Sequence, residues 1–210
     1  MYIAIAGNIG CGKTTLTNML AHHYGWEARF EAVTDNPYLE DYYKDIRRWS
    51  FALEVFFLKE RFRDLLRIAE ADHTIIQDRS IFEGVYVFTA NNKAMGNLTD
   101  RDFNTYMELF EQMMNMVKLP ELMIYLRASV PHLVANIQKR GRDYEQTMRL
   151  DYLEGLNKRY EDWIGDYKGN LVIINGDEVK FGDSEEAFQQ VCDKIDANLF
   201  GIFSPFNQQR

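Results

Sequence analysis

The sequence predicts an α/β fold in which five parallel strands form one sheet with helices on both of its faces. Two observations predict this fold. Short apolar runs alternate with longer amphipathic segments along the chain, and a glycine-rich turn directly follows the first apolar run. Strands that alternate with helices pair in parallel, because each helix carries the chain back across the sheet. With 210 residues the chain is long enough for one core, so we predict a single domain over residues 1–210.

The five predicted strands are apolar runs of four or five residues that are bounded by polar or turn-forming residues. They cover residues 2–6, 29–33, 73–77, 122–126 and 171–174. The first run stops at Gly7, and the third contains the β-branched pair Ile75-Ile76. Short runs of this kind are typical of strands that are buried on both faces of a parallel sheet.

The predicted helices lie between and after these strands, where apolar residues recur at spacings of three and four. They cover residues 13–24, 49–69, 102–118, 130–140, 147–164 and 184–199. Gly25 ends the first helix, and Pro131 stands at the opening of the fourth. We expect Pro120 to mark the end of the third helix, because proline cannot continue a helical hydrogen-bond ladder.

A phosphate-binding loop is predicted at the first strand-to-helix turn. The sequence Gly7-Asn8-Ile9-Gly10-Cys11-Gly12-Lys13-Thr14 has two glycines separated by four residues, followed by Lys and Thr. Glycines permit positive φ angles, so that backbone N–H groups and the helix N-terminus can surround phosphate oxygens. Lys13 would reach the β and γ phosphates and Thr14 would bind Mg²⁺, with Thr15 following in the same turn. The alternative is a glycine-rich turn that serves close packing alone.

Two further groups of charged residues stand where a parallel sheet places its ligands, near the carboxyl ends of strands. Glu31 follows the second predicted strand and could accept a proton from an acceptor hydroxyl, although a solvated loop carboxylate is the alternative. Asp78-Arg79-Ser80 follows the third strand. Asp78 suits Mg²⁺, directly or through water, and Arg79 suits phosphate or the carboxylate of the base; the alternative is a salt-bridged loop.

Two arginines flank a glycine after the fourth predicted helix, in Arg140-Gly141-Arg142-Asp143. One interpretation is a mobile cap whose arginines neutralise a moving phosphoryl group. The other is a cationic helix end that is terminated by glycine.

Composition excludes several classes of protein. The formal net charge of −8 argues against binding to a nucleic acid polymer, which needs clustered Lys and Arg. Only Cys11 and Cys192 occur, too few for a disulfide framework. Because no apolar run reaches the length of a membrane span and residues 2–6 lack the pattern of a signal peptide, we expect no membrane partner and a cytoplasmic location.

Together these residues resemble the deoxynucleoside kinase family, the group that includes deoxycytidine, deoxyguanosine and deoxyadenosine kinases. The markers follow in order from the loop at residues 7–14 through Glu31, Arg48-Trp49-Ser50-Phe51 and Asp78-Arg79-Ser80 to Arg140-Gly141-Arg142. The resemblance extends from Met1 to about Phe181. It implies a P-loop kinase fold with a small arginine-bearing lid at about residues 136–147, and ATP with Mg²⁺ as phosphoryl donor.

The resemblance also implies the role of each matching residue. Glu31 would be the general base on the 5′-hydroxyl of a deoxynucleoside, beside Arg79. Asp78 would help to hold Mg²⁺, and Arg140 and Arg142 would be lid arginines. The remaining matches would contact the deoxynucleoside or the adenine of ATP. They are Tyr43 and Glu145 at the sugar 3′-hydroxyl, Phe88 stacked on the base, Arg61 at the base edge, and Asp177, Glu178 and Val179 in the loop that contacts adenine.

Three positions depart from the family pattern. Glu54 stands where a glutamine faces the base, and an ionised glutamate accepts hydrogen bonds without donating any. This pattern suits guanine, whereas adenine or cytosine would need Glu54 protonated or turned away; Arg61 could also pair with Glu54. Gly84 replaces an aspartate, which predicts a roomier pocket. Asn136 replaces a lid arginine, which predicts looser contact with the adenine of the donor.

These observations predict ATP-dependent phosphorylation of a deoxynucleoside, with a purine favoured. A nucleoside monophosphate kinase such as thymidylate kinase is the first alternative, but it would need more basic residues at the acceptor. A regulatory nucleotide-binding protein without turnover is the second. The two long helices at residues 49–69 and 102–118 carry many aromatics and methionines, and with the family resemblance they predict a homodimer.

Overall fold

The computed structural model describes residues 1–31, 36–142, 145 and 148–201. Five strands form one parallel sheet in the order β2-β3-β1-β4-β5, as the sequence predicts. Their bounds are Tyr2–Ala6 for β1, Glu27–Arg29 for β2, Ile75–Asp78 for β3, Leu122–Arg127 for β4 and Leu171–Asn175 for β5.

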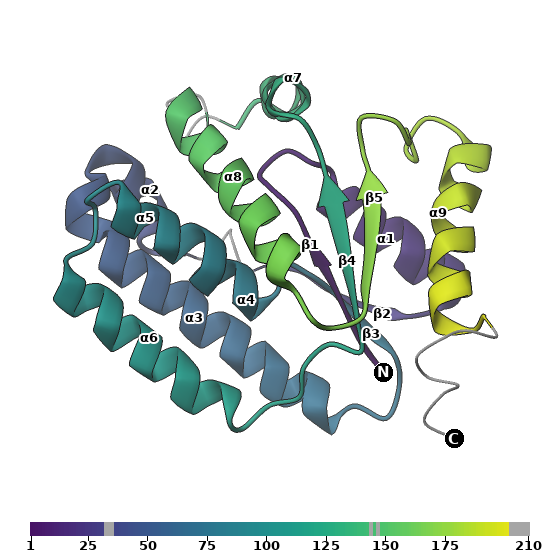
Figure 1. The fold of residues 1–210 in the computed structure, drawn as a ribbon, viewed down its shortest axis with the longest axis horizontal. Helices are drawn as coiled ribbons and strands as arrows, with labels where there is room; N and C mark the ends of the chain where they lie inside the picture. The colour runs from purple at the N-terminus through teal and green to yellow at the C-terminus, as the bar shows by residue number, and fades with distance from the viewer. Residues whose placement is uncertain (32–35, 143–144, 146–147, 202–210) are drawn as a thin grey trace.

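Helices cover both faces of this sheet, and the alternation of side chains along β1 divides the core in two (Figure 1). Ile3 and Ile5 pack with α1 (Lys13–Tyr24) and α9 (Glu185–Leu199). Tyr2, Ala4 and Ala6 face the other side, where they pack with α3 (Ile46–Glu70), α6 (Asp100–Met114) and α8 (Leu150–Asp166). Because both faces are buried, every residue of β1 is apolar and at most 5% exposed.

The helix α7 (Val130–Arg140) lies beyond the carboxyl ends of the strands (Figure 1). Pro131 stands in its first turn, and Gly141 ends it with a φ of 66°. Gly25 ends α1 in the same left-handed conformation, with a φ of 69°. Both helices therefore have the bounds that the sequence predicts, since glycine adopts this conformation without the steric cost of a Cβ atom.

Several other boundaries differ from the predictions. Strand β2 occupies residues 27–29 instead of 29–33, because Glu27 pairs with Ile75 at the start of β3 and this register fixes the paired segment; residues 32–33 lie outside the described part. Helix α6 ends at Met114 instead of residue 118, so it stops six residues before Pro120. Beyond it the backbone N–H of Met116 donates to the backbone oxygen of Met113 in a turn, and the side chain of Met116 is 67% exposed.

The remaining helices shift by a few residues. Helix α3 begins at Ile46, where the side chain of Asp45 accepts a hydrogen bond from the backbone N–H of Arg48, and α8 begins at Leu150. The predicted start of α8 at Thr147 lies outside the described residues. Helix α9 begins after Ser184, whose side chain accepts from the backbone N–H of Ala187.

Two helical segments are absent from the predictions. One is α2 (Leu39–Lys44), and the other is a continuous helical stretch made of α4 (Ile81–Glu83), the π-helix Gly84–Thr89 and α5 (Ala90–Ala94). The second stretch is rich in β-branched and aromatic residues, whose local preference is for strands. Burial of Val85 and Val87 against the core overrides that preference. No helix among the described residues is both long enough and apolar enough to cross a membrane.

Candidate active site

The glycine-rich loop connects β1 to α1 at the carboxyl edge of the sheet. Its glycines at positions 7, 10 and 12 have φ angles of 154°, 85° and 99°. Asn8 is buried, and its side chain accepts from the backbone N–H of Ile9 at 2.8 Å and donates to the backbone oxygen of Leu153 at 3.2 Å. The Nζ atom of Lys13 donates to the backbone oxygen of Asn8 at 3.0 Å. The loop therefore has the conformation and the cation that phosphate binding requires.

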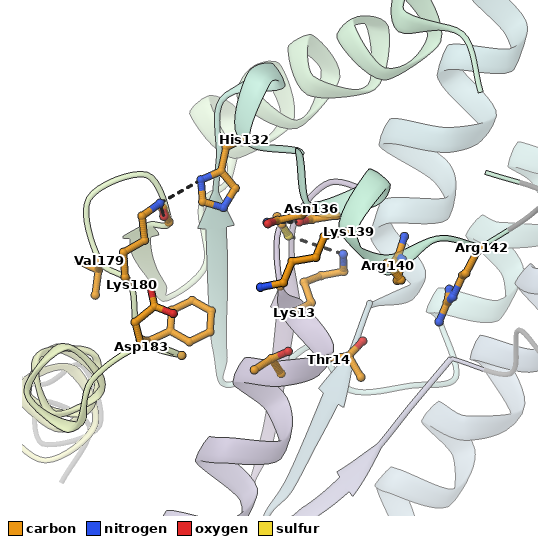
Figure 2. Close-up of a pocket in the computed structure, with 17 residues that line it drawn as sticks. Lys13, Thr14, His132, Asn136, Lys139, Arg140, Arg142, Val179, Lys180 and Asp183 are labelled. Carbon is orange, nitrogen blue, oxygen red and sulfur yellow. Dashed lines mark hydrogen bonds between the residues drawn. The ribbon is translucent and has the colours of Figure 1, made fainter. Parts of the chain in front are cut away.

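A cavity of about 720 Å³, here called the loop cavity, opens beside this loop. Figure 2 shows Lys13 and Thr14 on one side of it and the α7 residues His132, Asn136 and Lys139 on another. The cavity is lined by Gly10, Cys11, Gly12, Lys13, Thr14, Thr15, His132, Asn136, Lys139, Arg140, Arg142, Gly176 and the segment at residues 179–183. Several cations surround the space, which suits a polyanionic ligand.

A second cavity of about 1020 Å³, here called the central cavity, lies between α3, α2 and the carboxyl ends of β1 and β3. It holds seven of the eight residues predicted to bind the deoxynucleoside: Glu31, Tyr43, Glu54, Arg61, Arg79, Phe88 and Glu145. The two cavities share Gly10, Lys13, Thr14, Arg140 and Arg142 in their linings. Ligands in the two cavities would therefore meet at these residues.

Glu31 lies between two arginines in the central cavity. Its Oε2 atom pairs with Nε of Arg79 at 3.0 Å, and its Oε1 atom accepts from Nε of Arg61 at 3.1 Å and from Nη2 of the same side chain. Burial alone would raise the pKa of Glu31, but the charges of Arg61 and Arg79 outweigh burial and lower it. Glu31 is therefore an ionised carboxylate at neutral pH.

Arg79 is held in an unusual backbone conformation, with a φ of 73°. Its Nη1 atom donates to the hydroxyl of Tyr160 at 2.9 Å and lies 3.4 Å from Oε1 of Glu83. Its guanidinium also lies 4.6 Å from the centre of the Phe88 ring. These contacts fix the side chain so that Nε faces Glu31.

Glu83 joins Arg79 to the glycine-rich loop. The side chain is fully buried and accepts hydrogen bonds from the backbone N–H groups of Gly7 at 3.2 Å and Ser80 at 2.7 Å. It also accepts from the Tyr160 hydroxyl at 2.7 Å. Glu83 has no role among the predictions, because Gly7 and Tyr160 lie far from it along the chain and only the fold brings them to it.

Thr14 and Asp78 meet at the edge that both cavities share, where the Thr14 hydroxyl donates to Oδ2 of Asp78. A hydroxyl and a carboxylate side by side are the hard oxygen ligands that Mg²⁺ accepts. Among the described residues, no group of three or more His, Cys, Asp or Glu side chains forms a metal site. The pair therefore fits a magnesium ion that receives its other ligands from phosphate and water.

The comparisons with known proteins agree with this geometry. Residues 3–200 match the family model described as deoxynucleoside kinase. The chain belongs to the deoxynucleoside kinase family.

Individual relatives span nearly the whole kinase. It is 35% identical over 196 residues to the deoxyadenosine/deoxycytidine kinase of Bacillus subtilis (strain 168), covering 92% of this chain and 90% of the relative. It is 35% identical over 208 residues to the deoxyguanosine kinase of Lactobacillus johnsonii, covering 94% and 92%. A solved structure of M. mycoides deoxyadenosine kinase with dCMP as a product is similar with a TM-score of 0.83 and 30% identity, covering 94% of this chain and 100% of that one.

Gly84 is the one predicted acceptor residue that does not line the central cavity of the kinase. The prediction of a roomier pocket there is wrong, because Arg61 fills the space. A Cβ atom built on Gly84 would lie 2.4 Å from Nη1 of Arg61 and 3.2 Å from the Tyr106 hydroxyl. This Nη1 atom has no hydrogen-bond partner among the described residues, as expected where an aspartate is missing.

Glu54 does not pair directly with Arg61, which resolves one alternative from the sequence. Its Oε2 atom accepts from the Thr89 hydroxyl at 3.0 Å, and its Oε1 atom accepts from Nδ2 of Asn92 at 2.8 Å. Arg61 is engaged by Glu31 instead. Glu54 is 3% exposed and lines the central cavity.

The arginines of the predicted lid contact Glu145 in the kinase. Arg140 donates to both oxygens of Glu145, at 3.1 Å from Nε and 2.6 Å from Nη2, and Nη1 of Arg142 lies 3.7 Å from the same carboxylate. Residues 143–144 and 146–147 of the predicted lid lie outside the described residues. The amide of Asn136, which replaces a lid arginine, donates to the backbone oxygen of Gly10 at 2.8 Å and so ties α7 to the loop.

The loop after β5 contributes to the loop cavity through different residues than predicted. Of the three predicted residues, Val179 lines this cavity, whereas Asp177 accepts from the backbone N–H of Ser129 at 3.0 Å and pairs with His132 at 3.0 Å. Glu178 is exposed. His132, Lys139 and Lys180, which are absent from the predictions, also line the cavity (Figure 2). A helix of the observed bounds places His132 and Lys139 two turns apart on one side, a periodicity that could have indicated them.

Proposed function

We propose that this kinase binds MgATP in the loop cavity and a deoxynucleoside in the central cavity, and transfers the γ-phosphoryl group to the 5′-hydroxyl. The observation that carries the proposal is the shared lining of the two cavities by Lys13, Thr14, Arg140 and Arg142. A phosphoryl group at these residues would be in reach of a hydroxyl near Glu31. The product would be a deoxynucleoside 5′-monophosphate, and the M. mycoides relative holds such a product, dCMP.

Glu31 is proposed as the general base. Its lowered pKa keeps the carboxylate ionised, and a carboxylate positioned by two arginines can align the 5′-hydroxyl and accept its proton. Arg79 would neutralise phosphoryl charge while it holds Glu31. Lys13 would contact the β and γ phosphates from the loop.

Thr14 and Asp78 are proposed to hold Mg²⁺, the hydroxyl directly and the carboxylate directly or through water. Mg²⁺ would neutralise charge on the β and γ phosphate oxygens. Before nucleotide binds, the hydrogen bond from Thr14 to Asp78 keeps both oxygens at the edge where the cavities meet.

The segment at about residues 136–147 is proposed as a lid within a single domain. Arg140 and Arg142 reach both cavities, so they could neutralise the transferring group. Glu145 holds Arg140 and, with Tyr43, would bind the sugar 3′-hydroxyl. The residues of the glycine-rich loop, Thr15 and Val179 in the loop after β5 would hold the rest of ATP, whereas Asp177 and Glu178 do not line the loop cavity.

The proposed acceptor is a purine deoxynucleoside, deoxyadenosine or deoxyguanosine. Phe88 would stack on the base, and Arg61 and Glu54 line the same cavity. Relatives named for deoxyadenosine and deoxyguanosine support a purine, although the Bacillus subtilis relative is named for deoxycytidine as well as deoxyadenosine. Gly84 gives no support to this preference, because Arg61 fills the space beside it.

We further propose that the kinase is a cytoplasmic homodimer that pairs through the outer surfaces of α3 and α6. Leu66, Tyr86 and Leu109 are exposed hydrophobic residues on or beside these helices. Light scattering at micromolar concentration would give twice the chain mass of 24.7 kDa, and the mass of one chain would refute the dimer.

Phosphoryl transfer from labelled MgATP to a panel of acceptors tests the proposed activity. The panel contains deoxyguanosine, deoxyadenosine, deoxycytidine, thymidine and the four monophosphates. We expect transfer to free purine deoxynucleosides. Transfer to a monophosphate alone would overturn the proposal and remove the role assigned to Glu31.

A further inference from the structure

Glu54 is a buried carboxylate that faces the central cavity from α3. The side chain is 3% exposed, and each of its oxygens accepts one hydrogen bond from a protein donor, the Thr89 hydroxyl or the Asn92 amide. A carboxylate oxygen has two lone pairs, so each oxygen keeps one for a further partner. These lone pairs are available to a ligand in the central cavity, since Glu54 is part of the cavity lining.

The polarity of the protein contacts around Glu54 is fixed. Oδ1 of Asn92 accepts from the Tyr42 hydroxyl at 3.1 Å and from Nδ2 of Asn97 at 3.1 Å. Asn92 must therefore present its Nδ2 donor to Glu54 and cannot rotate to accept from it. A proton on Glu54 could not be donated to Asn92, so it would point to the Thr89 side or into the cavity.

Five titratable or charged groups face Glu54 from the elements around it. They are Arg61 on the same helix, Glu31 after β2, Tyr42 on α2, Tyr106 on α6 and Tyr152 on α8. Burial raises the pKa of Glu54 to about 7, because the opposing effects of Arg61, Thr89 and Asn92 are smaller and Glu31 adds to the rise. The three tyrosines remain neutral near pH 7, since burial raises the pKa of each.

The two protonation states of a carboxyl group match different bases. A protonated carboxyl offers one donor and one acceptor, which complements the N1 acceptor and 6-amino donor of adenine and the similar edge of cytosine. An ionised carboxylate offers two acceptors, which complement the adjacent N1–H and 2-amino donors of guanine. A protonated carboxyl could pair with N1–H and O6 of guanine, but it would leave the 2-amino donor without a partner at Glu54. A mismatched pair would leave a buried polar group without a partner, which costs about 1–3 kcal/mol or more.

We propose that Glu54 selects the base through its protonation state, so that the protonated enzyme takes deoxyadenosine and the ionised enzyme takes deoxyguanosine. This inference rests on the proposed function, because it assumes that the base occupies the central cavity. Glutamine at this position would present the protonated pattern permanently. Glutamate instead allows one protein to prefer either of two nucleoside substrates, and the preference changes near neutral pH.

The test is the pH dependence of relative specificity. Values of kcat/KM are measured for deoxyadenosine and deoxyguanosine between about pH 6 and pH 8.5, where neither base titrates. Ionisations that affect both reactions, including that of Glu31, cancel in the ratio of the two values. Because each base selects one form of free Glu54, the ratio of deoxyadenosine to deoxyguanosine should fall by up to about tenfold for each pH unit.

Glu54→Gln is the matched variant, because it keeps the shape and removes the ionisation. We expect it to favour deoxyadenosine with a ratio that no longer changes with pH. Thr89→Val keeps Glu54 but removes one donor to its carboxylate, so the ratio at fixed pH should move toward deoxyadenosine by about 3- to 30-fold. A wild-type ratio that changes less than twofold over this range, or that changes equally in Glu54→Gln, would overturn the inference.

Calorimetry without a phosphoryl donor separates this inference from the proposed catalytic activity. Binding heats in buffers of different ionisation enthalpy report proton uptake. Deoxyadenosine should take up close to one proton at about pH 8, and deoxyguanosine should release close to one at about pH 6, with neither effect in Glu54→Gln. Binding without proton exchange would overturn the role of Glu54 even if transfer occurs, whereas proton-linked binding without transfer would overturn the proposed function alone.

Discussion

The guanidinium of Arg61 occupies the space beside Gly84 that a side chain would need. A Cβ atom at position 84 would lie 2.4 Å from Nη1 of Arg61, while Nε and Nη2 of the same side chain hold Glu31. The absence of a side chain at one position thus permits the ion pair that places the proposed base.

The first prediction follows from this contact. Gly84→Ala should be less stable than the wild type by about 1–3 kcal/mol, because the methyl group must displace a guanidinium that Glu31 holds. Thermal unfolding measures the change. Gly165→Ala is the control, since Gly165 also lies in a helix but has nothing within 4 Å of its Cβ position, and it should be unchanged or up to about 1 kcal/mol more stable. Equal stability of the two variants would contradict the close contact.

Removal of the proposed base gives the second prediction. Glu31→Gln should lower kcat for phosphoryl transfer by about 10²- to 10⁴-fold, because an amide cannot accept the proton of the 5′-hydroxyl. The binding of ATP, measured by calorimetry, should change little. Glu161→Gln is the control, since Glu161 also pairs with an arginine, Arg127, but lies outside the linings of both cavities. Unaltered transfer by Glu31→Gln would show that another group is the base.

The third prediction concerns the stability of the folded protein as a function of pH. The folded-state pKa of Glu54 is raised from 4.5 to about 7, so its ionisation opposes folding. Stability should therefore be lost as pH rises from about 4.5 to about 7, with the full loss of about 3 kcal/mol present above pH 7. Glu54→Gln should match the wild type near pH 4.5 and exceed its Tm by about 6–12 °C at pH 8. A difference in Tm that does not vary with pH would contradict the raised pKa.

Glu83 gives the fourth prediction. Glu83→Gln should destabilise the kinase by about 3 kcal/mol, because an amide nitrogen would face a backbone N–H group or Arg79 in a fully buried site. Since Glu83 contacts the backbone of Gly7, the KM for ATP should also rise. Denaturant unfolding and initial rates measure the two effects. If the variant is destabilised but its KM for ATP is unchanged, the contact between Glu83 and Gly7 does not support ATP binding.

The fifth prediction concerns Mg²⁺ at Thr14. Thr14→Val should raise the Mg²⁺ concentration needed for half-maximal activity by about tenfold or more, because valine offers no oxygen to the metal or to Asp78. Thr14→Ser keeps the hydroxyl and should restore a nearly normal magnesium dependence. If Thr14→Val and Thr14→Ser need the same Mg²⁺ concentration for half-maximal activity, Thr14 is not a ligand of the metal.

Much of the site was predictable because local rules locate it. The loop at residues 7–14 is recognisable from its glycines and Lys13, and the acid and base residues follow strands whose carboxyl ends share one edge. The family resemblance added Tyr43, Phe88 and Glu145, which do line the central cavity. The resemblance failed at Gly84, because a glycine in the sequence does not show which neighbouring side chain occupies the space beside it. In the structure that side chain is Arg61.

By itself the sequence determined the alternation of strands and helices, the parallel sheet, the ends of α1 and α7 and the phosphate-binding loop. These features depend on periodicity, on the φ angles open to glycine and on chain order, all of which are local. The tertiary structure alone decided that Arg61 pairs with Glu31, that Glu83 ties Arg79 to the loop and that Thr89 and Asn92 bind Glu54. Apart from Arg79 and Glu83, these partners lie 30 or more residues apart, and their energies depend on burial, which only the packed fold creates.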